Sequence, residues 1–339
     1  MLDLAPYSLK VGHATDLDGG TGCTVIRGDS GPFRASFYLL GRATGTREVD
    51  ALQPGHLVDR TDAILLTGGS AFGLEAAGGV MQWMEERGRG FAIGHGVVPI
   101  VPAAVIFDLQ PIGSSRARPT PSMAMAAATD AASTISRFGT VGAGTGATVG
   151  KALGPTGAMK GGFGAAETVG GAPGAKDPLR VLAIAVVNAF GDVVAADGRI
   201  LAGARLPDGT FADTERLLAT GVQGSAAGGN TTLAVVAVNR SMARGELREL
   251  ARAAASAMHR RLRPAASLVD GDMVFAIAPI PDTGSAGLPT ADAGTVMAAG
   301  ALACSALERA IESAVVEATG LGGVPGLADH PSAGAESPG

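Results

Sequence analysis

The chain has 339 residues, of which 46% are hydrophobic, 17% charged and only 4% aromatic, and its formal net charge is −5. This composition can fill the core of one large domain or two ordinary ones and is not that of a disordered chain. A mildly acidic balance without a block of lysine and arginine argues against a nucleic-acid partner, and no apolar stretch reaches the ~20 residues of a membrane-spanning helix.

The N-terminal half predicts short strands followed by helices. Apolar and β-branched runs between glycine-rich turns predict strands over 23–26, 33–38 and 62–67. A helix is expected over about 71–87, with Ser70 as its N-cap and Gly88 as its stop. A second helix is expected over 122–137, and a glycine-rich stretch without clear periodicity follows over 140–176.

The second half contains stronger patterns. The apolar run 181–187, a turn at 189–192 and the return at 193–195 predict a β-hairpin. Glycine, serine and turn residues over 206–229 predict a flexible linker, and Thr231 to Val238 directly after it predicts a buried strand. Further elements are expected in this order: an amphipathic helix over 244–262, a strand over 272–277, a long helix over 291–318, and a disordered tail over 321–339.

Common catalytic motifs fail on spacing. The stretch 144–151 resembles a phosphate loop, but Thr145 stands where its first glycine should be, and Phe72 stands where a nucleophile elbow would close with glycine. None of the five histidines pair at metal-ligand spacing, and no persuasive Ser-His-Asp set exists. We therefore expect no metal and no cofactor, and any hydrolytic base must come from elsewhere.

The cysteines and the first residues indicate the cellular compartment in which we expect the protein. Cys23 and Cys304, the two cysteines, are isolated, which suits a reducing cytosol. The first residues lack the basic and apolar segments of a signal peptide. We expect a cytoplasmic protein.

The junction between Asn230 and Thr231 offers a base that is not histidine. An α-amino group has an unperturbed pKa near 8, so a threonine at a chain start has a proton acceptor beside its own hydroxyl. An internal threonine acquires that amine only if the preceding peptide bond breaks. The flexible Gly228 and Gly229 before the junction and the strand after it suit such a self-cleavage, although a simple turn entering a strand would give the same four residues.

The wider context resembles the L-aminopeptidase/D-esterase family, which includes β-aminopeptidases and nylon-oligomer (6-aminohexanoate oligomer) hydrolases. The similarity covers about 8–320 and is carried by the segments 15–25, 66–76, 101–108, 229–232, 256–260 and 269–276. It implies an α/β fold of four layers, an αββα sandwich of two β-sheets between helix layers. It also implies a single self-processing N-terminal-nucleophile hydrolase domain over 1–320, cut into 1–230 and 231–339, and a homotetramer of cut protomers.

The same resemblance assigns roles to five residues. Thr231 matches the nucleophile, and the cut falls between Asn230 and Thr231. Asn188 matches a family asparagine that donates to the oxyanion, a role in which a lost donor typically costs about 2.7–4 kcal/mol. Lys151 matches a lysine beside the nucleophile in the nylon-oligomer branch. Asp270 and Asp272 match an acidic pair in the same branch. We expect these two carboxylates to hold the ammonium and hydroxyl of Thr231.

The substrate stays open at this point. The threonine nucleophile and the two aspartates resemble the oligomer hydrolases, whereas the short N-terminus and the segment 67–73 resemble the broader aminopeptidase group. An acidic site would suit a small peptide or amide with a free amine near the scissile bond. Two alternatives remain: an ornithine acetyltransferase-like acyltransferase, which typically cuts after alanine rather than asparagine, and an uncut binding protein without enzymatic activity.

Overall fold

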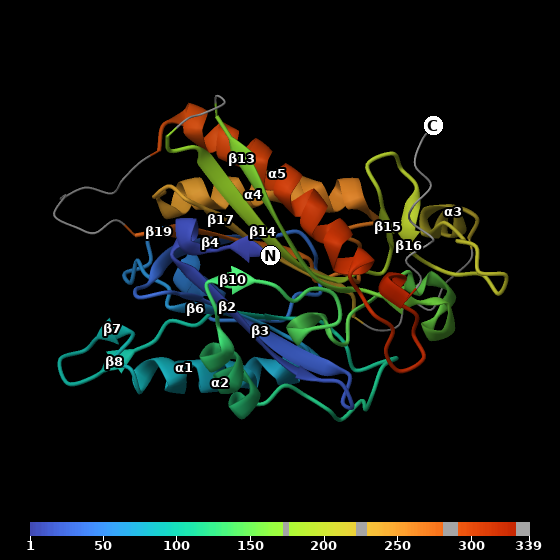
Figure 1. The fold of residues 1–339 in the computed structure, drawn as a ribbon, viewed down its shortest axis with the longest axis horizontal. Helices are drawn as coiled ribbons and strands as arrows, with labels where there is room; N and C mark the ends of the chain where they lie inside the picture. Colours follow the sequence, from blue (N-terminus) through green and yellow to red (C-terminus); the bar gives the residue numbers. More distant parts are fainter. Residues whose placement is uncertain (172–175, 222–228, 281–290, 330–339) are drawn as a thin grey trace.

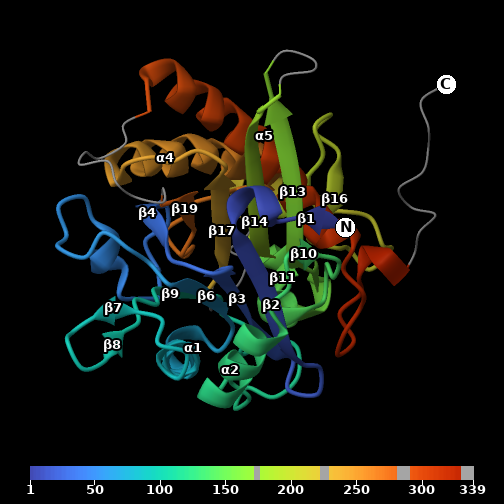
Figure 2. The ribbon, with the colours of Figure 1, turned by 60° about the vertical axis from the view of Figure 1, so that its left-hand side comes forward.

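Two five-stranded sheets lie face to face between two layers of helices in the computed structural model (Figures 1 and 2). The structure describes residues 1–171, 176–221, 229–280 and 291–329. The four layers are those of the αββα sandwich expected from the sequence, so the predicted fold class is confirmed.

The first sheet carries the candidate site. Its strands run in the order β13 (Gly162–Gly170), β14 (Leu179–Asn188), β17 (Thr231–Val238), β19 (Met273–Pro279) and β4 (Phe33–Leu39). Strand β17 is antiparallel to β14 and parallel to β19. Helices α4 (Arg244–Arg261) and α5 (Ala293–Val316) cover the outer face of this sheet (Figure 1).

The second sheet supports the first from the other side. Its order is β2 (Leu9–Asp16), β3 (Thr21–Gly28), β6 (Ala63–Thr67), β9 (Ala103–Val105) and β5 (Thr46–Arg47). Helices α1 (Ala77–Glu85) and α2 (Pro121–Asp130) cover its outer face. The remaining elements are β1 (Leu2–Asp3), β7 (Phe91–Ala92), β8 (Val97–Val98), β10 (Thr134–Ile135), β11 (Thr148–Val149), β12 (Met159–Lys160), β15 (Asp192–Val194), β16 (Ile200–Ala202), β18 (Leu262–Arg263) and α3 (Thr214–Ala219).

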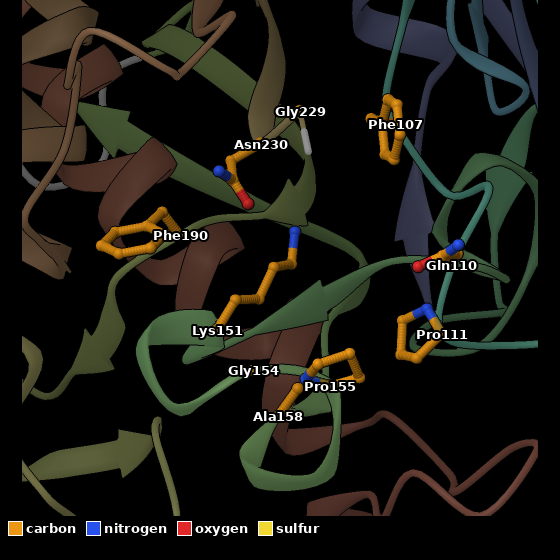
Figure 3. Close-up of a pocket in the computed structure, with 10 residues that line it drawn as sticks. All are labelled: Phe107, Gln110, Pro111, Lys151, Gly154, Pro155, Ala158, Phe190, Gly229 and Asn230. Atoms are coloured by element: carbon orange, nitrogen blue, oxygen red, sulfur yellow. The ribbon is translucent and has the colours of Figure 1, made fainter. Parts of the chain in front are cut away.

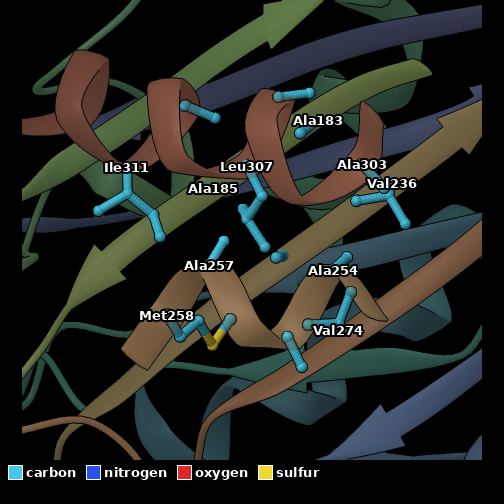
Figure 4. Packing of buried hydrophobic residues seen from close by; sticks show 14 of the residues in the cluster. Ala183, Ala185, Val236, Ala254, Ala257, Met258, Val274, Ala303, Leu307 and Ile311 are labelled. Atoms are coloured by element: carbon cyan, nitrogen blue, oxygen red, sulfur yellow. The ribbon is translucent and has the colours of Figure 1, made fainter. Parts of the chain in front are cut away.

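Strand β17 is buried on both faces, which explains its unbroken apolar sequence. Ala234, Val236 and Val238 face α4 and α5, and the alternate residues face the second sheet. Small side chains let the helices approach: Figure 4 shows Ala254, Ala257, Ala303 and their neighbours meeting strands β14, β17 and β19. The strand that begins at Thr231 is therefore held rigidly from two sides.

The predicted strand at 231–238 and the helix at 244–262 are confirmed, the latter ending at Arg261. The predicted hairpin over 181–195 is wrong: β14 belongs to the first sheet, whereas β15 pairs with β16 and β18. The Asp192 carboxylate explains the departure, because it accepts hydrogen bonds from the backbone N–H groups of Ala204 at 2.9 Å and Thr214 at 2.6 Å.

The glycine-rich stretch 140–176 hides strand β13, which the sequence did not predict. A Cβ on Gly164 would lie 2.1 Å from the Ala310 carbonyl oxygen, and one on Gly162 would lie 2.4 Å from that of Ala314. Glycine is needed there because α5 crosses the strand at backbone contact, and this need removes the usual strand composition.

The structure also differs from the sequence predictions at a helix end, at a helix cap and within the predicted linker. The helix expected over 122–137 ends at Asp130, and the β-branched pair after it forms β10. Ser70 does not cap a helix with its side chain; it lies at the start of a 3₁₀ turn with φ of 52°. The predicted linker contains α3, capped by Asp213, and only 222–228 of it lies outside the described residues.

The tail predicted as disordered from residue 321 is ordered over 321–329. Leu321 and Val324 form a bridge there, and a 3₁₀ turn covers Leu327–Asp329. The Asp329 carboxylate accepts hydrogen bonds from the N–H groups of Gly320 and Gly326, which ties this segment down. Residues 330–339 lie outside the described part of the chain.

Candidate functional site

The peptide bond between Asn230 and Thr231 is buried where strand β17 begins. Asn230 is 1% exposed and Thr231 is 4% exposed. Thr231 stands opposite Asn188, the last residue of β14, and Asn230 forms a parallel bridge with Asp270 just before β19. Backbone pairing on both sides therefore fixes the position of this bond.

The carbonyl oxygen of Asn230 accepts two hydrogen bonds. The N–H of Gly271 donates to it at 2.7 Å, and the hydroxyl of Thr231 donates to it at 2.6 Å. A Cβ on Gly271 would lie 2.7 Å from Thr231 Oγ1, so a glycine keeps the space that this hydroxyl occupies. The hydroxyl lies against the carbonyl group that precedes it, and a fixed N–H stands where negative charge on that oxygen would develop.

Asn188 and Lys151 form a second part of the site. Lys151 Nζ donates to Asn188 Oδ1 at 2.8 Å and to the Asn188 carbonyl oxygen at 3.0 Å. The N–H of Thr148 also donates to Oδ1, at 3.0 Å, while Asn188 Nδ2 donates to the Phe107 carbonyl at 3.0 Å. These donors fix which end of the amide is oxygen and leave the second hydrogen of Nδ2 for another acceptor.

The two aspartates hold backbone rather than the Thr231 side chain in the intact chain. Asp272 accepts from the N–H of Thr232 at 2.6 Å and from that of Ala266 at 3.0 Å. Asp270 Oδ2 accepts from Ser267 at 2.8 Å. Asp270 Oδ1 is buried and has no hydrogen-bond partner among the described residues, so this oxygen is available to a new donor.

Burial shifts the protonation of these groups. Desolvation lowers the pKa of Lys151 to about 7, against the opposing effect of the carboxylates of Asp270, Asp108 and Asp272. Desolvation and the neighbouring Asp270 raise the pKa of Asp272 above its usual range. A lysine and an acid are thus both moved toward neutral pH at one buried site, which is typical of functional sites.

A cavity of about 420 Å³ opens beside this bond (Figure 3). The rings of Phe107 and Phe190 stand on opposite sides of it, with the Lys151 side chain between them. The described residues that line it are Phe107, Gln110, Pro111, Lys151, Gly154, Pro155, Ala158, Phe190, Gly229 and Asn230. The cavity gives a small molecule a route to the Asn230–Thr231 bond.

Asp108 braces the loop that contacts Asn188. Its carboxylate is 3% exposed and accepts from the Thr21 hydroxyl and from the Gly69 N–H, each at 2.6 Å. Phe107, the preceding residue, presents the carbonyl that orients the Asn188 amide. Burial raises the pKa of Asp108, and its two donors and Lys160 oppose that shift.

Lys160 is fully buried behind the same loop. Its ammonium donates to the backbone carbonyls of Gly144, Thr145 and Ala147, at 3.4, 2.6 and 2.8 Å. Desolvation lowers its pKa to about 7. This lysine holds together the segment that leads to Thr148 and Lys151.

The structure thus brings all of the sequence-predicted residues together around one bond: Thr231, Asn230, Asn188, Lys151, Asp270 and Asp272. Sequence reasoning gave no role to Gly271, Thr148, Phe107, Asp108 or Lys160. Phe107 and Asp108 lie in the segment 101–108 that carries the resemblance, and Gly271 stands between two aspartates at 270–272.

Other kinds of site find no support in the described part of the chain. No group of three or more His, Cys, Asp or Glu side chains there could hold a metal ion. None of the described helices is long and apolar enough to cross a membrane. Cys23 and Cys304 are buried and unpaired with each other.

Comparisons with known proteins place the sequence among peptidases and amide hydrolases. The sequence model of peptidase family S58 matches residues 7–328. An uncharacterised aminopeptidase of Mycobacterium tuberculosis is 38% identical, over 95% of each chain, and a 6-aminohexanoate-oligomer endohydrolase of Paenarthrobacter ureafaciens is 30% identical, over 79% of this chain and 72% of its own.

Solved structures resemble the fold. A Burkholderia β-aminopeptidase has a TM-score of 0.69 at 19% identity, over 94% of this chain and 88% of its own. The L-aminopeptidase D-Ala-esterase/amidase of Ochrobactrum anthropi, described as a variant of the Ntn-hydrolase fold, also has a TM-score of 0.69, at 18% identity, over 94% of this chain and 86% of its own.

Proposed function

The chain belongs to peptidase family S58 and is a hydrolase of amide or peptide bonds, and on this premise we propose that it cuts itself between Asn230 and Thr231 and then uses Thr231 as its nucleophile. The observation that carries the proposal is the contact at the bond itself. The Thr231 hydroxyl lies 2.6 Å from the Asn230 carbonyl oxygen, which the Gly271 N–H already holds at 2.7 Å.

Self-cleavage begins with attack of Thr231 Oγ1 on the Asn230 carbonyl carbon. The Oγ1–C bond forms, the C–N bond breaks, and the hydroxyl proton ends on the Thr231 nitrogen, which leaves an ester and a free amine. Water then hydrolyses the ester to an Asn230 carboxylate and restores the hydroxyl. The Gly271 N–H stabilises the negative charge that develops on the carbonyl oxygen in both steps.

The cut enzyme repeats this chemistry on other amides. The Thr231 amine accepts the hydroxyl proton while Oγ1 attacks the substrate carbonyl carbon. The substrate C–N bond then breaks, the leaving amine takes that proton, and water hydrolyses the ester to release the acyl group as a carboxylate and restore the hydroxyl. The substrate carbonyl oxygen takes the place of the Asn230 oxygen, beside Gly271, with the free hydrogen of Asn188 Nδ2 as a second donor. Asp270 Oδ1, which has no partner in the described structure, receives the new ammonium.

The roles of Lys151 and Asp272 are to hold these groups in place. Lys151 fixes the Asn188 amide from its oxygen end. Asp272 fixes the N–H of Thr232 and so orients the residue just before it. Small peptides or amides are the proposed substrates, as the names of the relatives suggest. The predicted homotetramer and cytoplasmic location stay predictions.

Family membership argues against an uncut binding protein. An acetyltransferase activity is tested by supplying an acetylated donor together with ornithine. We expect the purified enzyme to hydrolyse amides and to transfer no acetyl group.

Two matched variants test the nucleophile. Thr231→Val keeps the branched shape and removes the hydroxyl, and Thr232→Val makes the same change at the next residue, whose hydroxyl is buried without a partner in the described structure. On a denaturing gel, wild type and Thr232→Val should give fragments of about 23 and about 11 kDa, which follow from scaling the mass of 33.4 kDa by residue count. Thr231→Val should stay intact and hydrolyse no amide; cleavage or activity in this variant contradicts the proposal.

A further inference from the structure

The cavity lies on the acyl side of the Asn230–Thr231 bond. Gly229 and Asn230, which precede the bond, form part of its lining, whereas the residues from Thr231 onward are buried in β17. A Cβ on Gly229 would lie 2.8 Å from Phe107 Cβ, so the chain before the bond runs against the Phe107 side chain. In self-cleavage this segment is the acyl group, so it marks where the acyl half of any other substrate binds.

The described walls of the cavity combine apolar side chains with neutral amides and one amine. Five of the ten described lining residues have apolar side chains, namely Phe107, Phe190, Pro111, Pro155 and Ala158. Gln110 and Asn230 are neutral amides, and Lys151 is the single ionisable side chain among the described lining residues. No carboxylate belongs to the described lining.

The amine of Lys151 already has hydrogen-bond acceptors within the protein. It donates to both oxygens of Asn188, so it marks the catalytic end of the cavity. A second cation in the cavity would lose contact with water and would find no carboxylate among the described lining residues. An apolar side chain would instead gain by leaving water.

Resting on the proposed function, we propose that this cavity is the acyl-side subsite and that it selects substrates whose acyl half carries an uncharged apolar side chain. Its volume of about 420 Å³ holds one amino-acyl group rather than a long peptide. Gln110, whose side chain is exposed at the cavity, is the residue where the charge preference can be changed.

Two substrates that differ by one terminal amine isolate the charge. Norleucyl and lysyl p-nitroanilides have unbranched side chains of similar length, and only the lysyl side chain ends in an ammonium. We expect wild type to hydrolyse the norleucyl substrate with a kcat/KM at least about tenfold higher, since 1.4 kcal/mol corresponds to a factor of ten. Equal or faster hydrolysis of the lysyl substrate overturns the proposal.

An isosteric variant changes the charge of the cavity without changing its shape. Gln110→Glu should raise the lysyl-to-norleucyl ratio of kcat/KM by about two- to fivefold, the range of a partly exposed charge pair. Gln53→Glu makes the same change at an exposed glutamine outside the cavity and should leave the ratio as in wild type. An unchanged ratio in Gln110→Glu also overturns the proposal.

The test of the cavity can fail independently of the test of Thr231 as the nucleophile. A denaturing gel reports on self-cleavage in each preparation, and the substrate ratio reports on the cavity whichever group is the nucleophile. If the chain stays intact and still prefers the norleucyl substrate, the nucleophile assignment fails while the subsite stands. If the chain is cut at Thr231 without that preference, the subsite fails while the nucleophile stands.

Discussion

Replacing Gly271 by alanine should slow self-cleavage by moving the attacking hydroxyl. The Cβ would lie 2.7 Å from Thr231 Oγ1 and 2.7 Å from the Ala43 carbonyl oxygen, whereas ordinary contacts begin at 3.4 Å. Either the loop or the hydroxyl must therefore move by about 0.7 Å, and a displacement near 1 Å can cost ~100-fold in rate. The φ of Gly271 is not in the left-handed region, so alanine itself fits the backbone.

We expect the Gly271→Ala chain to be cut about 30- to 100-fold more slowly than wild type, because the hydroxyl or the N–H donor loses its alignment with the Asn230 carbonyl. The assay is a time course of fragment appearance on denaturing gels after purification at low temperature. Gly78→Ala is the matched control, because a Cβ there meets nothing within 4 Å. If Gly271→Ala is cut as fast as Gly78→Ala, the geometric reasoning is refuted.

Two further predictions concern stability. Asp108→Ala leaves the Gly69 N–H and the Thr21 hydroxyl without their acceptor, so denaturant unfolding should show a loss of about 1–3 kcal/mol; a loss below about 0.5 kcal/mol would contradict this. Burial lowers the pKa of Lys160 from 10.5 to about 7, so the unfolded state binds more protons between those values and wild-type stability should rise with pH across that window. Lys160→Met should lack about 1.4 kcal/mol of that rise per pH unit, and parallel pH profiles of the two proteins would show the idea to be wrong.

The elements that the sequence predicts well are those whose burial is uniform along their length. Strand β17 could be placed from sequence because it is apolar on both faces. Helix α4 could be placed because one stripe of it meets the sheet while Arg248, Arg252 and Arg260 are exposed. In both elements the local pattern and the tertiary environment agree.

Strand β13 could not be predicted for the opposite reason. Gly162 and Gly164 are required by the backbone of α5, which is more than a hundred residues further along the chain. A requirement of that kind leaves no local strand signal, and glycine-rich sequence is read as a loop. The false hairpin has a similar cause, because Asp192 turns the chain toward residues beyond 200.

The site was predictable in its residues but not in its contacts. Resemblance to a family pointed to Asn188, Lys151, Asp270 and Asp272, and the register between β14 and β17 gathers them at Thr231. The part played by the Gly271 N–H depends on the approach of the loop before β19, which no local pattern shows. Sequence reasoning also did not foresee that Asp272 binds backbone N–H groups.

Sequencing the N-terminus of the smaller fragment tests the central claim most directly. We expect a fragment of about 11 kDa that begins Thr-Thr-Leu-Ala-Val, the residues from Thr231 onward. A fragment that begins at another residue, or an intact chain that hydrolyses amides, would contradict the assignment of Thr231 as an N-terminal nucleophile.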